Sequence, residues 1–124
     1  MMQKTRLFLL VETVAFASAS LVHSGFLIPG YEHAQARIAE GLIAAVLFTG
    51  LLVSLAIQEW THLSGMAAQS FALLGTLVGL FTIAIGVGPR TVPDLTFHAT
   101  IVVVLVWGLI VARRAPSFAS RRRG

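Results

Sequence analysis

Four long apolar stretches dominate this chain of 124 residues and limit what it can fold into. Each is close to the roughly 20 residues that an α-helix needs to cross the hydrocarbon core of a bilayer. We place them at residues 7–28, 38–57, 65–87 and 95–112. The polar connections are short, so neighbouring helices must run antiparallel. The sequence therefore predicts an all-α polytopic membrane protein, an up-down-up-down bundle of four transmembrane helices that forms one domain over residues 1–112.

The composition supports a lipid surrounding. Hydrophobic residues make up 56% of the chain and charged residues only 11%, whereas soluble domains carry roughly 25% charged residues. The absence of cysteine excludes a disulfide framework and thiolate metal ligands. The pI of about 11.2 would suit nucleic acid, but the basic residues gather near the termini, as membrane topology requires. We therefore expect the lipid bilayer, and not nucleic acid, as the partner.

The basic residues also predict the orientation of the helices. Most of them precede the first helix or follow the last one: Lys4, Arg6, Arg113, Arg114, Arg121, Arg122 and Arg123. Arg37 and Arg90 would lie on the other side. By the positive-inside rule, we expect a multi-pass protein of a bacterial-type inner membrane with both termini cytoplasmic. Residues 113–124 would form a basic cytoplasmic tail.

Small residues indicate where helices approach one another. Gly75 and Gly79 have the GxxxG spacing that allows close contact between helix backbones. We expect this contact inside the bundle. A homo-oligomer, or a place in a larger membrane complex, is the alternative.

Ionisable residues gather at the expected outer side of the membrane. His23 would lie about five residues inside the first helix, and His98 about one turn inside the fourth. Glu40 would reach the same level from the second helix. Ionisable groups within spans indicate a functional site by default, so we predict a ligand site built from His23, Glu40 and His98. Its expected rim consists of His33, Arg37, Arg90 and Asp94.

Part of this region has a structural explanation. Gly86, Gly88 and Pro89 are expected to end the third helix, because proline cannot continue it. Asp94 is then expected to cap the fourth helix. Neither role accounts for His98.

Several ligands suit these side chains. Two histidines and a carboxylate could hold a transition metal. Haem b is another candidate, with His23 and His98 as axial ligands and Arg37 and Arg90 near the propionates. A third is a quinone-like molecule or an anionic headgroup. The structural alternative is a polar layer that only satisfies the helix ends, and no catalytic residue is predicted.

Glu12 is a separate candidate, deep in the first helix. It shares a stripe with His23, and Ala15 and Ala19 lie between them. Small residues beside polar ones mark the face that packs in the bundle. We therefore expect Glu12 to face the bundle and to be largely neutral, because desolvation disfavours the charged form. It is the candidate for intramembrane proton titration.

These features support more than one class of function. The leading hypothesis is a small membrane protein that binds a metal, a haem or a small polar ligand at its outer polar site. A second is a non-catalytic accessory subunit or assembly factor of a larger membrane complex. A third is a small membrane enzyme or a proton-coupled transporter.

Overall fold

The protein is a bundle of four long helices. The computed structural model describes residues 2–124, without the side chains of Phe118 and Arg121. The expected role of the Arg121 side chain in the basic tail therefore lies outside the described residues. The helices are α1 (Met2–His23), α2 (Ala34–Ala56), α3 (Thr61–Ala84) and α4 (Val92–Arg113), with a short 3₁₀ helix (Gln58–Trp60) and α5 (Phe118–Arg121). The four long helices are long and apolar enough to cross a membrane. The predicted all-α fold is confirmed, and the described residues contain no strand.

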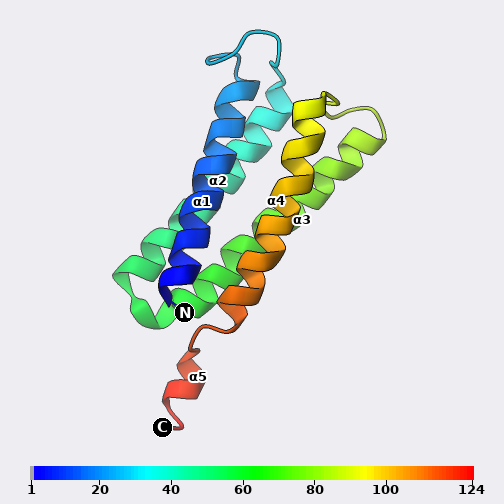
Figure 1. Ribbon diagram of the computed structural model, residues 1–124. Helices are drawn as coiled ribbons and strands as arrows, with labels where there is room; N and C mark the ends of the chain where they lie inside the picture. The colour runs from blue at the N-terminus through cyan, green and yellow to red at the C-terminus, as the bar shows by residue number, and fades with distance from the viewer. Residues whose placement is uncertain (1) are drawn as a thin grey trace.

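The chain alternates in direction from one helix to the next (Figure 1). Both termini therefore lie at one end of the bundle. The connections 24–33 and 85–91 lie at the other, which we call the distal end. In this arrangement the C-terminal end of α1 meets the N-terminal ends of α2 and α4.

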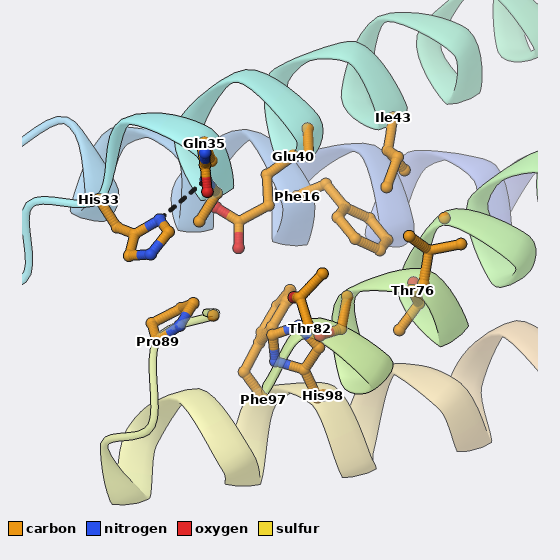
Figure 2. Close-up of a pocket in the computed structure, with 16 residues that line it drawn as sticks. Phe16, His33, Gln35, Glu40, Ile43, Thr76, Thr82, Pro89, Phe97 and His98 are labelled. Carbon is orange, nitrogen blue, oxygen red and sulfur yellow. Dashed lines mark hydrogen bonds between the residues drawn. The ribbon is translucent and has the colours of Figure 1, made fainter. Parts of the chain in front are cut away.

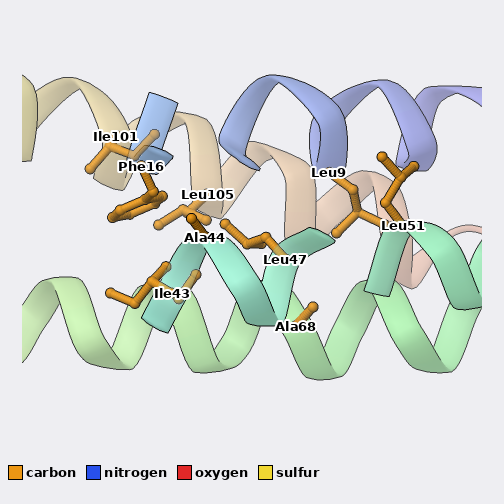
Figure 3. Close-up of a cluster of buried hydrophobic side chains, with 10 residues drawn as sticks. Leu9, Phe16, Ile43, Ala44, Leu47, Leu51, Ala68, Ile101 and Leu105 are labelled. Carbon is orange, nitrogen blue, oxygen red and sulfur yellow. The ribbon is translucent and has the colours of Figure 1, made fainter. Parts of the chain in front are cut away.

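Apolar side chains from all four helices fill the bundle (Figure 3). The core consists of Leu9, Phe16, Ile43, Ala44, Leu47, Leu51, Ala68, Ala72, Ile101 and Leu105. The outside is apolar as well: Leu74 is 64% exposed and Trp107 is 63% exposed. A helix that is apolar on every face is typical of a membrane span.

The first helix ends earlier than we predicted. The expected span continued to residue 28, but α1 ends at His23. Gly25 has a φ of 74°, a left-handed conformation that ends helices and favours glycine. Hydrophobicity extends past this point, which is why the apolar pattern predicted a longer helix. His23 is consequently the last residue of α1, and not five residues inside it.

The turn between α3 and α4 also differs from the prediction. The expected third span reached residue 87, whereas α3 ends at Ala84, and Gly86 follows with a φ of 87°. Thr91, and not Asp94, is the N-cap of α4. Asp94 is the third residue of a capping box, in which its carboxylate accepts hydrogen bonds from the backbone N–H and the hydroxyl of Thr91.

The GxxxG glycines pack inside the chain. A Cβ at Gly75 would lie 2.8 Å from Cδ1 of Ile43 in α2, and one at Gly79 would lie 3.2 Å from Nε2 of His98 in α4. The two glycines thus let α3 approach two different neighbours, in agreement with contact inside the bundle.

Candidate functional site

His23 lies between two carboxylates at the distal end. Its Nδ1 is 2.6 Å from Oε2 of Glu40, and its Nε2 is 2.9 Å from Oδ1 of Asp94. The three residues are at most 6% exposed. We call His23, Glu40 and Asp94 the distal cluster. It joins α1, α2 and α4 through side chains alone.

The two hydrogen bonds of the distal cluster need two hydrogens. A neutral imidazole carries one N–H, and an ionised carboxylate only accepts hydrogen bonds. Two hydrogens are needed for the two contacts. Either His23 carries both, or one of the carboxyl groups carries the second. The cluster is therefore able to hold and exchange a proton among three side chains.

Asp94 has two roles. One oxygen completes the capping box with Thr91, and the other contacts His23. Asp94, which we expected at the rim of the site, thus contacts His23 directly. The start of α4 lies beside the end of α1 at the distal end of the bundle, which makes this contact possible.

His98 lies one turn further along α4 and faces a cavity. Its Nδ1 is 2.7 Å from the backbone carbonyl of Asp94. Because a carbonyl only accepts, Nδ1 carries the hydrogen, and Nε2 of the neutral ring is an acceptor. A Cβ at Gly79, which also lines the cavity, would lie 3.2 Å from Nε2 of His98.

The cavity has a volume of about 160 Å³ and lies between α2, α3 and α4. Figure 2 shows the Glu40 carboxyl entering it from α2, opposite His98 and Phe97 on α4. Phe16 of α1 closes its deeper side, and its other labelled lining residues are His33, Gln35, Ile43, Thr76, Thr82 and Pro89. It thus combines aromatic walls with a carboxyl and an imidazole.

A separate groove runs along the opposite side of the distal cluster, between α1 and α4. It has a volume of about 540 Å³, and both His23 and Asp94 line it. Phe97 lines the groove as well as the cavity. The distal cluster and Phe97 therefore separate two spaces with different openings.

The other expected rim residues have different surroundings. His33 lines the cavity and caps α2, its Nδ1 accepting from the backbone N–H of Ala36 at 3.1 Å. Arg37 is exposed. Arg90 donates to the carbonyls of Ile83 and Ala84 at 2.8 and 3.0 Å, which satisfies the end of α3. Neither Arg37 nor Arg90 lines the cavity or the groove, and their expected place at the rim of the site stays a prediction.

The geometry does not support a metal or a haem. Among the described residues, no group of three or more His, Asp and Glu side chains is placed to hold a metal ion. Both nitrogens of His23 already contact carboxylates, which leaves neither free to ligate. A porphyrin with four pyrrole rings exceeds a cavity of about 160 Å³.

Glu12 is buried, as its position on the first helix predicted, and it has an unexpected partner. Its side chain and that of Gln69 are both 0% exposed. Nε2 of Gln69 donates to the two Glu12 oxygens at 2.9 and 3.1 Å. A lone amide within the third apolar stretch was the signal that could have identified Gln69.

Comparison with known proteins identifies no relative: no family model, no curated protein and no solved structure matches the chain. The function is therefore inferred from the residues and their geometry.

Proposed function

We propose that this protein spans a membrane and binds, in its distal cavity, the ring of a small lipophilic molecule that carries a hydroxyl group, of the phenol or quinol type. The observation that carries this proposal is the position of His98, whose Nε2 is an acceptor beside a cavity walled by Phe16 and Phe97. Aromatic walls with a few placed polar groups are typical of sites for small organic ligands.

The size of the cavity supports a single ring. An engineered apolar cavity of about 150 Å³ holds one benzene molecule, and the present cavity is of similar volume. A ring hydroxyl would donate to Nε2 of His98. Glu40 would supply a second polar contact, because His23 engages only one of its oxygens.

The opening of the cavity supports a ligand that arrives from lipid. Gln35 and Ala39 of α2 and Val78 of α3 line it and are exposed on the outside of the bundle. In a membrane this side would face acyl chains. A ring with an apolar tail could enter here and leave its tail in the bilayer.

We also propose the orientation. The bundle places Lys4, Arg6 and the basic tail at one end, and Arg37 and Arg90 near the distal end. The positive-inside rule then assigns the termini to the cytoplasm and the distal cavity to the opposite face of an inner membrane.

Binding of para-fluorophenol, followed by fluorine NMR on purified protein, tests the proposed function. Fluorobenzene is the matched probe, because it has the same ring and no hydroxyl. We expect saturable binding of both probes, with the phenol bound more tightly. The variant His98→Ala should weaken phenol binding roughly 2- to 10-fold, the value of one net hydrogen bond, and leave the affinity for fluorobenzene less affected.

Two further variants control this experiment. His62 is partly buried and, like His98, contacts a backbone carbonyl through Nδ1, at 3.0 Å, but it lies at the other end of the bundle. His62→Ala should therefore leave binding unchanged. Gly79→Ala should weaken phenol binding, since its methyl group would cover Nε2. Equal affinities for the two probes, or no saturable binding, would contradict the proposal; the latter, with a stable co-purified membrane complex, would favour an accessory subunit.

A further inference from the structure

Glu12 and Gln69 form a polar pair in the interior of the bundle, apart from the cavity. Glu12 is eleven residues from His23, which is about 16 Å along a helix. Neither Glu12 nor Gln69 lines the cavity or the groove. The pair connects α1 and α3 and is fully buried.

The α4 backbone lies directly against this pair. A Cβ at Gly108 would come within 2.1 Å of Nε2 of Gln69 and 2.6 Å of Oε1 of Glu12. No side chain other than hydrogen fits at position 108 without moving the pair. Three helices therefore meet at Glu12, Gln69 and Gly108.

One atom of the pair has no partner. Oε1 of Gln69 is buried and makes no hydrogen bond to the described residues. A buried carbonyl without a donor is costly. The neighbouring carboxyl can supply a donor only if it carries a proton.

The charges around Glu12 also favour a protonated carboxyl group. Gln69 is neutral, and the other ionisable residues of the four long helices lie toward the helix ends: Lys4, Arg6, His23, Arg37, Glu40, His62, Asp94, His98 and Arg113. Among the residues that the structure describes, no cation is paired with Glu12. An unpaired charge in this position is strongly disfavoured.

We propose that Glu12 and Gln69 form a proton-binding site within the bundle. The protonated carboxyl of Glu12 donates to Oε1 of Gln69, and Nε2 of Gln69 donates back to the other carboxyl oxygen. This arrangement requires only that the side-chain amide of Gln69 rotates so that its oxygen and nitrogen both face the Glu12 carboxyl. The bound proton then joins α1 to α3 beneath the backbone of α4. The site does not depend on ligand binding in the distal cavity.

Infrared spectroscopy of the protein with carbon-labelled glutamate tests this proposal. At neutral pH we expect a carboxylic-acid carbonyl band that disappears in Glu12→Gln. The difference between the two proteins isolates Glu12 from Glu32, Glu40 and Glu59. A carboxylate band in place of the acid band, lost in the same variant, would overturn the proposal.

Thermal unfolding provides an independent measurement. Glu12→Gln should have a melting temperature close to that of the wild type, because an amide can donate and accept in place of the acid. Gln69→Leu and Gly108→Ala should melt several degrees lower. Gly41→Ala is the matched glycine control, since its methyl group would meet only Oγ of Ser20, at 3.2 Å. A Glu12→Gln protein as unstable as Gln69→Leu would contradict the proposed site.

Discussion

His23 connects three helices through its two ring nitrogens, so its removal should affect more than one contact. In His23→Ala, the buried carboxyl groups of Glu40 and Asp94 would both lose the imidazole that now lies between them. Removing one partner from a buried charged pair typically costs about 3–5 kcal/mol. We expect a clear fall in melting temperature in detergent, and a much smaller fall in His62→Ala.

The double variant His23→Ala/Glu40→Ala tests whether the two side chains contribute to stability as a unit. Its destabilisation should be smaller than the sum of the two single effects, because the carboxylate left unpaired by the first substitution is absent. Additive losses would mean that the two side chains do not depend on each other. That result would contradict the distal cluster as a unit.

At the scale of elements, the apolar pattern predicted the helices well and their ends less well. Four long apolar runs separated by short polar connections leave one architecture, so the bundle could be predicted. The end of α1 at His23 could not, because it follows from the left-handed conformation of Gly25, while the hydrophobic residues continue to Ile28.

The candidate site was predictable only in part. His23, Glu40 and His98 are near helix ends that a bundle must bring together, and His23 does contact Glu40. The contact of Asp94 with His23, and that of Glu12 with Gln69, depend on how far each helix is rotated about its axis. Sequence spacing does not give that rotation across two helices.

The N-cap of α4 gives a prediction about the stability of a helix end. Thr91→Ala removes the hydroxyl that accepts from the backbone N–H of Asp94 and donates to its carboxylate. The loss of an N-cap residue costs about 1 kcal/mol, and here it should also loosen Asp94 against His23. Thermal unfolding should show a loss in Thr91→Ala and near-complete recovery in Thr91→Ser. Equal stability of the two variants would show that the hydroxyl is not needed.

At the scale of the whole molecule, the proposed orientation determines which compartment the distal end faces. Compartment reporters fused after Gly124 and inserted within residues 30–35 should report opposite sides of the membrane. We expect the first in the cytoplasm and the second outside it, because seven basic residues flank the termini and two lie toward the distal end. A reporter that places Gly124 outside the cytoplasm would reverse the sidedness of the cavity.

The central claim is that His98 accepts a hydrogen bond from a ligand held in the distal cavity. Nitrogen NMR of histidine-labelled protein observes this contact directly, because Nε2 of a neutral ring changes its resonance when it accepts a hydrogen bond. Addition of para-fluorophenol should shift the Nε2 signal of His98 in a saturable manner, and fluorobenzene should produce a much smaller shift. An unmoved His98 signal while para-fluorophenol binds would contradict the account.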